Sequence, residues 1–490
     1  MRHPTVILYN PQSSASRKPV LPMALLAVGA LLEGEFDYRI VDGNLERHED
    51  LVSAIDDLGA TVLGITVMGG PQLTDAVRAA RRLRRERPDV KIVWGGYFPT
   101  QHAEVCLRSD YVDVVVAGHG EHCFLSFLRA LREGRSTDGI PGVVTSTSAR
   151  EAVAPAPIPD PDDLPDFPYH RVPVERYVRR TFMGVRTLPH HSSYGCPFRC
   201  NFCAVVNMVD GRWKAQSAER TAATVTHLVD RFGADAVEFY DNNFFVSEKR
   251  TAEFADRIAH HGIGWWGEAR IDTLLKYDAA TWRLMQRSGL RMVFLGAESG
   301  SDETLRRMNK GGKASAEATL ELAAVMRSYG IIPEFSFVLG NPPEPERDVA
   351  ETLRFVRRLK AVHPDAETIF YMYTPVPLAG ELYDSAVASG FRFPTALDEW
   401  VSEEWQEFAQ RRTGVSWWLR DPLRRRVRNF ERVVNAFYPT VTDTKLSPGM
   451  RLLLRGLSAW RYRLQIYAMP LELLALQKLI RYQRPETTGF

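Results

Sequence analysis

The chain has 490 residues, of which 45% are hydrophobic and 25% charged, and its 62 basic and 60 acidic residues give a formal net charge of +2. This length predicts about two or three domains, and the composition excludes a disordered chain, a collagen and a small disulfide-stapled protein. The balanced charge gives no reason to expect a nucleic-acid partner. No apolar run is long enough for a transmembrane helix or a signal peptide. We therefore expect a cytoplasmic protein with reduced cysteines.

Strand and helix patterns alternate over residues 1–148, which predicts a doubly wound, Rossmann-like parallel sheet. Ligands of such sheets bind at the carboxyl ends of the strands. The candidate ligand contacts are therefore the residues that follow the strands, among them Thr66, Gly95, Gly96, Gly118 and Glu121. The predicted strands are 5–10, 38–43, 61–67, 91–96 and 112–118, and the predicted helices are 20–34, 48–59 and 72–87.

A proline-rich stretch follows within residues 149–185. Seven prolines lie between positions 151 and 173. Proline removes a backbone donor and restricts its neighbours, so we expect an extended, non-helical linker that lies on the surface.

The alternation then resumes over residues 186–400. It gives about six βα units, too few for a closed eight-stranded barrel, and predicts a partial (β/α)6 barrel. Beyond residue 400 the strand patterns stop, and a helical domain is expected over 401–490, with helices at 421–437 and 448–483. The predicted barrel strands are 186–195, 236–243, 265–272, 292–300, 333–342 and 368–377.

The strongest chemical signal is a CxxxCxxC cluster formed by Cys196, Cys200 and Cys203. A zinc site would need a fourth ligand, for which His190 or His191 is available. A thioredoxin-type pair would leave one cysteine unexplained. The other two cysteines, Cys106 and Cys123, stand alone on helix-like segments and are expected to be inert.

An iron–sulfur cluster explains the same spacing. A 4Fe–4S cube takes four ligands, so three thiolates leave one iron open to a small molecule that binds through an amine and a carboxylate. Gly195 permits a tight turn into the loop. Phe202, beside the third cysteine, is placed to pack against an adenine ring.

This cysteine spacing at the end of a first barrel strand resembles that of the radical S-adenosylmethionine (SAM) superfamily, and later segments fit in order. The resemblance implies that the open iron holds SAM, whose reductive cleavage yields a 5′-deoxyadenosyl radical. It also implies that Arg270 meets the SAM carboxylate and that Glu298 and Ser299 contact the ribose and amine. Other branches of the superfamily bind the SAM amine through a Gly-Gly-Glu motif that this chain lacks, and Asp241 is the candidate for that role. The matching segments are Tyr240–Phe244, Glu268–Asp272, Leu295–Ser301, Met308–Gly311 and Gly340–Glu344, where Pro343 replaces the usual glycine.

A doubly wound domain ahead of such a barrel resembles the cobalamin-binding radical SAM group of methyltransferases and the anaerobic magnesium-protoporphyrin monomethyl ester cyclase. The resemblance implies that Gly95 and Gly96 let the backbone approach the corrin tail, and that Thr66, Gly118 and Glu121 also contact cobalamin. The segment 42–47 departs from the D-x-H-x-x-G cobalamin motif, since Asn44 replaces the histidine and Arg47 the last glycine. Cobalamin is therefore expected to bind without a lower axial histidine.

By this resemblance the chain is expected to be a cobalamin-dependent C-methyltransferase acting on an unactivated carbon of a small molecule. An oxidative cyclase or carbon–carbon rearrangement enzyme is the alternative, and a metal-stabilised sensor or interaction protein is the alternative from another class. The radical reaction implies an electron donor such as flavodoxin or ferredoxin.

The C-terminal region is strongly basic, with 14 basic and 5 acidic residues over 420–490. This charge is consistent with a solvated helix face or with contact to an anionic substrate or membrane surface. No base-reading motif accompanies it, so no nucleic acid is expected. Arginines 424, 425, 426, 428 and 432 lie on one predicted helix, and Trp417, Trp418, Trp460, Tyr462 and Tyr467 suit either a membrane interface or a lid over the barrel.

Overall fold

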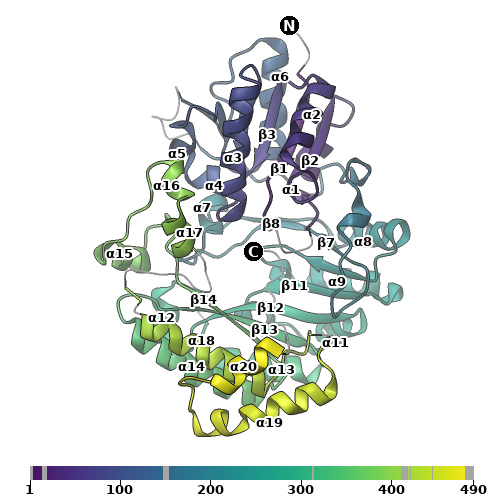
Figure 1. Ribbon diagram of the computed structural model, residues 1–490. Helices are drawn as coiled ribbons and strands as arrows, with labels where there is room; N and C mark the ends of the chain where they lie inside the picture. The colour runs from purple at the N-terminus through teal and green to yellow at the C-terminus, as the bar shows by residue number, and fades with distance from the viewer. Residues whose placement is uncertain are drawn as a thin grey trace.

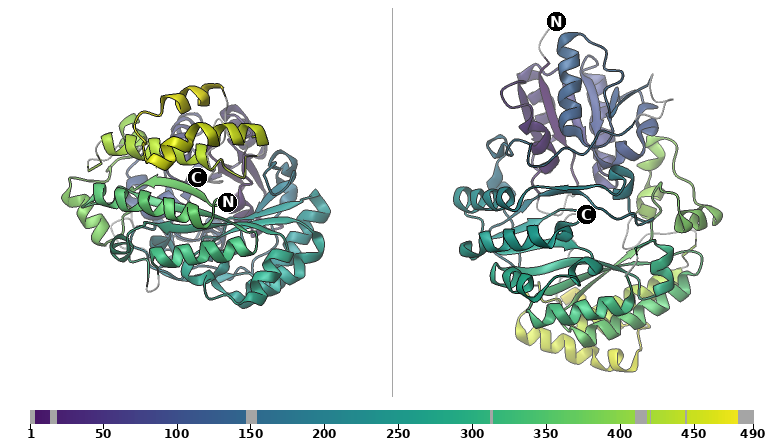
Figure 2. Two further views of the ribbon diagram at one scale, coloured as in Figure 1. Left: turned by 90° about the horizontal axis from the view of Figure 1, so that it is seen from below. Right: turned by 180° about the vertical axis from the view of Figure 1, so that it is seen from behind.

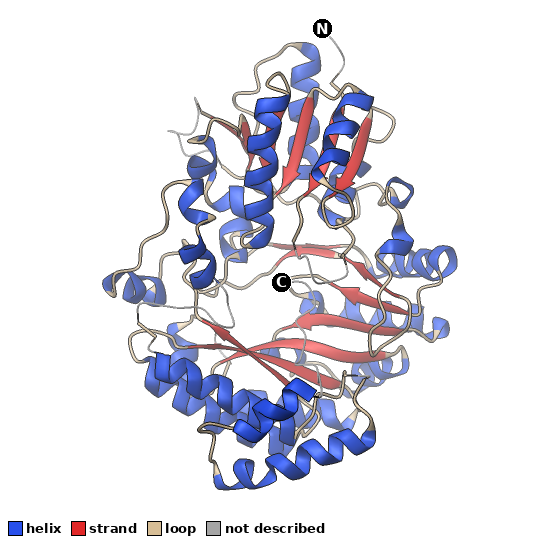
Figure 3. Cartoon of the chain, in the orientation of Figure 1, coloured by secondary structure: helices blue, strands red, loops and turns tan. Residues whose placement is uncertain are grey.

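The fold is given by a computed structural model that describes residues 4–13, 19–146, 154–311, 314–409, 418–419, 421–443 and 445–479. Two six-stranded sheets form its framework, and Figure 1 shows the N-terminal sheet at the top and the second sheet below it. The last helices lie at the opposite end of the molecule from the N-terminal sheet. Helices flank both sheets, as Figure 3 shows. The chain is α/β, as the alternating patterns predict.

The N-terminal sheet has the strand order β2-β1-β3-β4-β5-β6. Its first five strands are parallel, and their buried apolar runs are typical of a sheet covered on both faces. The doubly wound prediction is confirmed, and the structure adds a short antiparallel edge strand that the sequence does not reveal. The strands are β1 (Val6–Asn10), β2 (Tyr38–Asp42), β3 (Val62–Thr66), β4 (Lys91–Gly95), β5 (Val114–Val116) and β6 (Val143–Thr145).

Helices cover both faces of this sheet. The first and last helices of the domain pack together in one apolar core, and α2 and α3 contribute to a second core. The helix predicted over 20–34 is shorter in the structure, since Pro22 precedes its first residue and Gly34 adopts a left-handed conformation after its end. The helices are α1 (Met23–Ala30), α2 (His48–Leu58), α3 (Pro71–Glu86), α4 (Tyr97–Gln101), α5 (Ala103–Leu107) and α6 (Gly120–Glu133).

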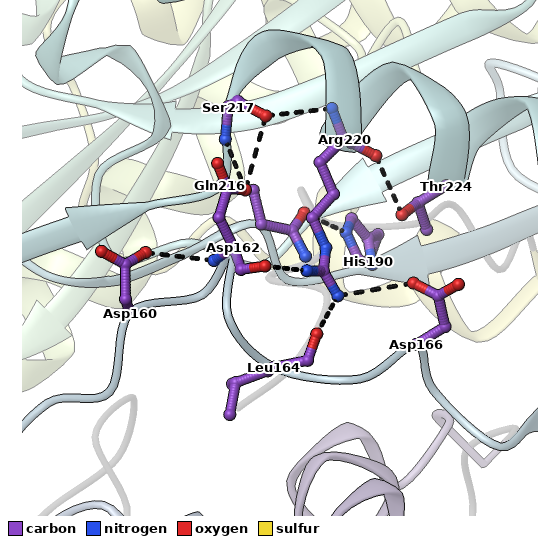
Figure 4. A network of polar contacts seen from close by, with 9 residues as sticks. All are labelled: Asp160, Asp162, Leu164, Asp166, His190, Gln216, Ser217, Arg220 and Thr224. Atoms are coloured by element: carbon purple, nitrogen blue, oxygen red, sulfur yellow. Dashed lines mark hydrogen bonds and ion pairs between the residues drawn. The ribbon is translucent and has the colours of Figure 1, made fainter.

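The proline-rich linker is held against the barrel. The backbone N–H of Ser217 donates to Asp162 (2.8 Å) and Arg220 donates to the Leu164 carbonyl, so the start of α8 (Ala218–Phe232) anchors the segment, as Figure 4 shows. No helix forms between residues 154 and 168, as predicted. The prediction of a wholly non-helical linker is wrong at two single turns that each follow a proline, η1 (Tyr169–Arg171) and η2 (Val174–Arg176).

The second sheet has the order β14-β13-β12-β11-β10-β7, and every neighbouring pair is parallel. Because β7 and β14 are the two ends of the sheet, this is a partial six-stranded barrel, as predicted. Its helices are α8, α9 (Glu248–Ile258), α11 (Ala279–Arg287), α13 (Ala316–Ser328) and α14 (Pro345–Val362), with a short α10 (Ile271–Leu274) and α12 (Asp302–Arg307). Its strands are β7 (Thr187–His190), β10 (Ala236–Phe239), β11 (Gly264–Ala269), β12 (Leu290–Glu298), β13 (Ile332–Leu339) and β14 (Glu367–Met372).

The strand predicted over 186–195 is two strands in the structure. After β7, a short β8 (Ser193–Gly195) leaves the barrel sheet and pairs antiparallel with β9 (Trp213–Ala215). The chain between them carries the three clustered cysteines and the short α7 (Val205–Val209). This two-stranded ribbon therefore frames the cysteine loop.

The C-terminal region is helical, as predicted, but the helix expected over 448–483 is broken. Gln465 takes a left-handed conformation that ends the first segment, and Pro470 precedes the second. Figure 2 shows these helices from two further directions. The helices are α15 (Glu381–Ala388), α16 (Leu397–Trp400), α17 (Glu403–Ala409), α18 (Asp421–Phe437), α19 (Pro448–Leu464) and α20 (Leu471–Leu479).

The aromatic residues singled out near the C-terminus mostly point inward. Trp418 donates its ring N–H to the Gly340 carbonyl (2.9 Å), Tyr462 stacks on a neighbouring ring of α18, and Tyr467 accepts a hydrogen bond from Arg357 (2.7 Å). Only Trp460 is exposed among those described, and Trp417 lies outside the described residues. In the described ranges, no helix combines the length and hydropathy needed to cross a bilayer.

Candidate active site

The cysteine loop begins at Gly195, where the backbone needs a glycine. Its φ is +81°, and a Cβ there would lie 2.3 Å from the carbonyl oxygen of Arg212, the residue before β9. A side chain would therefore collide with the ribbon that frames the loop. The loop then places Cys200 in a buried position, with Cys196 and Cys203 partly exposed, and all three are free thiols.

The loop is fastened to the segment that follows α12. The Asn201 backbone N–H donates to the Met308 carbonyl (3.1 Å), and its side-chain amide donates to the Arg307 carbonyl (2.6 Å). In return, the Asn309 amide donates to the Arg199 carbonyl (3.0 Å). These three contacts give the motif at 308–311 a structural role, since the chain at the end of α12 holds the cysteine loop in place.

Arg270 stands directly over the loop at the end of β11. One guanidinium nitrogen lies 3.2 Å from Cys200 Sγ, and the group sits 3.7 Å from the centre of the Phe198 ring. Asp272 holds it by two hydrogen bonds of 2.9 and 3.1 Å. Arg270 thus lies between the cysteine loop and Asp272, and each of its three nitrogens makes a contact.

The charge around the thiols suits metal-bound thiolates. Burial raises the pKa of Cys203 to about 12 and also raises the pKa of Cys196, so neither ionises readily without compensation. Arg270 supplies positive charge beside the loop, and the Asn243 amide points at Cys196 Sγ over 3.8 Å. Three thiols with such donors around them fit an iron–sulfur cluster.

The histidines considered as zinc ligands have other partners. His190 Nε2 lies 3.0 Å from the Gln216 amide oxygen and is almost fully buried, while the His191 ring packs edge-on against Tyr194. Both isolated cysteines are buried apart from the loop, and burial raises the pKa of Cys123 to about 12. Cys106 and Cys123 are thus packed residues, as expected.

Lys310 contacts both Phe202 and Glu298 beside the loop, although the sequence alone assigns it no role. Lys310 pairs with the buried Glu298 carboxylate at 2.7 Å, and its ammonium lies 5.9 Å from the Phe202 ring centre. Glu298 has a φ of +65°, a strained conformation for a non-glycine residue. The motif Met308–Gly311 was the available signal for Lys310.

Asp241 and Ser299 occupy a different kind of environment, because both are completely buried. Asp241 accepts hydrogen bonds from the Ser192 backbone and hydroxyl (2.7 and 2.6 Å) and from the Ser193 hydroxyl (2.7 Å). The Ser299 hydroxyl donates to Asp348 (3.0 Å). The contacts of Asp241 join the segments that follow β7 and β10, and the contact of Ser299 joins the end of β12 to α14.

At the sheet of the N-terminal domain, three predicted residues come together. Gly96 has a φ of +97°, and a Cβ there would lie 3.1 Å from Thr66 Oγ1. Gly95 has open surroundings, since the nearest atoms to its added Cβ belong to Val116 at 3.7 Å. Thr66, Gly95 and Gly96 therefore form one glycine-lined edge that a ligand can approach.

Gly118 serves another purpose in the structure. A Cβ on it would lie 2.7 Å from both the backbone N and O of Ala156, where the linker passes. Its N–H donates to Thr100 Oγ1 (2.9 Å), and Thr100 in turn donates to the Gly96 carbonyl (2.7 Å). The glycine thus accommodates the linker, and Thr100, which no motif identifies, connects the two glycine loops.

Glu121 lies in a buried polar cluster between the two domains. The Tyr194 ring from β8 lies 4.8 Å from the His119 ring and 5.0 Å from the His191 ring. Glu121 Oε2 lies 3.9 Å from His119 Nδ1, while His119 Nε2 and His191 Nε2 are buried without a hydrogen-bond partner among the described residues. Because buried polar atoms are normally paired, this cluster suits a polar ligand held between the domains.

The loop at 42–47, which replaces the histidine motif, is held by hydrogen bonds to Asp42. Asp42 accepts hydrogen bonds from the Asn44 backbone and side chain (2.9 and 2.8 Å) and from the Tyr177 hydroxyl (2.8 Å). His48, the nearest histidine, lies 3.8 Å from Glu86 on α3. Asn44 and His48 thus both have partners within the N-terminal domain.

Comparisons with known proteins match both halves of the chain. Residues 15–128 match the B12 binding domain, and residues 191–356 match the radical SAM superfamily. An uncharacterized methyltransferase of Pyrococcus horikoshii is 27% identical over 396 residues, which cover 78% of this chain and 83% of that protein. The anaerobic magnesium-protoporphyrin IX monomethyl ester cyclase of Synechocystis is 24% identical over 382 residues, covering 75% of this chain and 74% of the cyclase.

A solved structure shares the arrangement of the domains. The radical S-adenosylmethionine methyltransferase TsrM from Kitasatospora setae, with cobalamin and a [4Fe-4S] cluster bound, aligns with a TM-score of 0.63. The alignment covers 76% of this chain and 77% of TsrM at 21% sequence identity. This likeness is one of fold.

Proposed function

This chain is a radical SAM enzyme with an N-terminal B12-binding domain, and from that premise we propose that it is a cobalamin-dependent methyltransferase acting on an unactivated carbon of a small molecule. Its cofactors are a 4Fe–4S cluster, SAM and cobalamin. The observation that carries the proposal is the loop of Cys196, Cys200 and Cys203, braced at the mouth of the barrel beneath Arg270.

The three cysteines are the residues that would hold the cluster, and the cluster supplies the electron for reductive cleavage of SAM to the 5′-deoxyadenosyl radical. Arg270 and Asn243 direct N–H groups at two of the sulfur atoms. Such hydrogen bonds stabilise thiolate charge and shift the reduction potential of a bound cluster upward.

Phe202, Arg270 and Glu298 form the proposed SAM-binding side of the same loop. Phe202 offers an aromatic face for the adenine, and Arg270 offers the positive charge for the carboxylate. Glu298 is paired with Lys310, so this ion pair presents a buried polar group to the ribose or amine. The contacts of Asp241 and Ser299 support only a positioning role for these two residues.

The glycine-lined edge at Thr66, Gly95 and Gly96 and the unpaired polar atoms near Glu121 support a cobalamin site at the carboxyl end of the N-terminal sheet. When bound there, cobalamin would carry a methyl group taken from SAM to the substrate carbon. The residues of this chain would hold the corrin between the domains and exclude water. The amide groups of the corrin would then pair with the free nitrogen atoms of His119 and His191.

Two partners belong to the proposal. A one-electron reductant such as flavodoxin or ferredoxin would reach the cluster, and the basic C-terminal helices would contact a membrane surface. The sensor or interaction protein is not supported, because residues 191–356 match the radical SAM superfamily and the relatives are named as a methyltransferase and a cyclase. A radical oxidative cyclase remains the second candidate function, since a magnesium-protoporphyrin cyclase is among the relatives.

Methyl-labelled SAM separates the two candidates. The reconstituted protein, supplied with cobalamin, a reductant and a cell extract of its source, should transfer the labelled methyl group to a small molecule detected by mass spectrometry. A product that has lost hydrogen and carries no label would instead support the cyclase.

A further inference from the structure

The exposed apolar side chains of the described residues are concentrated on the last two helices. Of eleven exposed large hydrophobic residues, nine lie between positions 452 and 474. Contiguous exposed apolar surface of this kind marks a site of interaction with a protein or a membrane. The nine are Leu452, Leu453, Leu457, Trp460, Leu464, Ile466, Met469, Leu471 and Leu474, here called the C-terminal apolar surface.

The spacing on α19 shows that this surface is a helix face distinct from the packed one. Leu453, Leu457, Trp460 and Leu464 follow one another at intervals of four, three and four residues, which places them in one stripe. The residues that α19 buries are others, including Leu454 and Tyr462. The helix is thus anchored by one stripe and leaves a second apolar stripe without a protein partner among the described residues.

The charge of this region favours an anionic partner. α19 contains four arginines and no acidic residue. Arg461 is committed to Glu472 and to backbone carbonyls, whereas Arg455 and Arg463 are exposed. Two copies of the chain meeting through this face would bring like charges together, which opposes a homodimer. An anionic bilayer complements both the arginines and the leucines.

The neighbouring helix α18 is less suited to enter a bilayer, although its arginines are the most clustered. Its large apolar residues, such as Val427 and Phe430, are buried in the core. It can contribute charge but no apolar insertion. Trp460, whose ring lies 4.6 Å from the Arg461 guanidinium, is instead placed where aromatic side chains settle at a membrane interface.

We infer that α19, the turn at 465–470 and α20 dock onto the surface of an anionic lipid bilayer. The leucines, Met469 and Trp460 enter the headgroup region, while Arg463 contacts lipid phosphates and Arg455 stays over the Phe437 ring of α18. The inference rests on the proposed membrane contact. It assigns that contact mainly to the C-terminal apolar surface and not to the arginine-rich helix α18. It does not depend on the chemistry at the cysteine loop.

The test is co-sedimentation of the full-length protein with vesicles of phosphatidylcholine alone or mixed with phosphatidylglycerol. We expect the protein to pellet with the anionic vesicles at low salt and only weakly with the neutral ones. The double variant Leu453→Gln/Leu464→Gln, which changes two side chains of the stripe that are 47% and 66% exposed, should lower the bound fraction on the order of tenfold. Arg463→Gln should weaken binding to the anionic vesicles alone.

Val185→Gln is the matched control, because this side chain is 53% exposed but lies far from α19 in the sequence, in the segment before β7. It should bind like wild type. Wild-type protein that stays in the supernatant, or a leucine variant that pellets normally, would overturn the inference. So would light scattering that shows a dimer which the leucine variant dissociates, since a second copy would then cover the surface.

5′-Deoxyadenosine formation from SAM is measured on the same preparations. The leucine variant should retain it, because its substitutions are exposed and remote from the cysteine loop. Protein that binds vesicles but forms no deoxyadenosine would count against the proposed chemistry and leave the docking surface standing.

Discussion

A guanidinium nitrogen of Arg270 lies 3.2 Å from the sulfur of Cys200. The contact joins the end of the third barrel strand to the cysteine loop, and Asp272 fixes the direction of the guanidinium. Because a planar group held on two sides has little freedom, Arg270 can place its charge at the sulfur at little entropic cost. The relationship makes the third strand end part of the cluster site.

Replacing Arg270 by lysine tests this contact. Lysine keeps the charge but cannot make the paired bonds to Asp272 or stack on Phe198. Deoxyadenosine formation should fall on the order of tenfold to a hundredfold, while iron and sulfide content stay near wild type. Arg287→Lys, in an exposed ion pair with Asp256, is the control and should change nothing. Full activity of Arg270→Lys would contradict the assignment.

Asp241 distinguishes a structural from a ligand-binding role. Asp241→Asn breaks a buried network of three accepted hydrogen bonds and should lower the free energy of unfolding by about 2–4 kcal/mol. Denaturant unfolding measures this change, and SAM affinity of the folded fraction should change little. A variant of wild-type stability that no longer binds SAM would show instead that Asp241 contacts the ligand.

Two glycines of the N-terminal domain should behave oppositely. Gly118→Ala forces a side chain against the Ala156 backbone and should cost about 1–3 kcal/mol of stability. Gly95→Ala has room for its methyl group, so its stability should stay close to wild type. It should nevertheless retain less cobalamin, which corrin absorbance after desalting measures. Equal cobalamin retention by Gly95→Ala and wild type would argue against a ligand at this edge.

Glu268 should make stability depend on pH. Burial and the nearby Asp241 raise the pKa of its carboxyl group to about 8, compared with about 4.3 in an unfolded chain. Between these values the folded chain binds the extra proton, so its free energy of unfolding falls as the pH rises from about 5 to about 8. Glu268→Gln stays neutral throughout and should show a shallower fall in urea titrations. An identical slope would disprove the link.

The sequence predicts the framework well because buried parallel strands are continuous apolar runs, as in β3 and β5. It overestimates strand length at the carboxyl ends. Residues 240–243, for example, continue the strand pattern of the sequence, but β10 ends at Phe239 and these residues form a loop. It also joins α19 to α20, because Gln465 gives no turn signal and Pro470 alone marks the break.

The site is only partly readable from sequence, because its contacts join distant segments. The cysteine spacing identifies the loop by itself. The packing of Ala156 against Gly118, and the pairing of Lys310 with Glu298, depend on how the linker and the strand ends meet in space. No local pattern separates an aspartate that braces a strand, such as Asp241, from one that meets a ligand.

The most direct test is the fate of SAM on the reconstituted enzyme under anaerobic, reducing conditions. The wild-type protein should carry an iron–sulfur cluster and release 5′-deoxyadenosine. The triple variant Cys196→Ala/Cys200→Ala/Cys203→Ala should lose both, since these residues supply the proposed thiolate ligands. Continued formation of deoxyadenosine by the triple variant would contradict the assignment of the cluster to this loop.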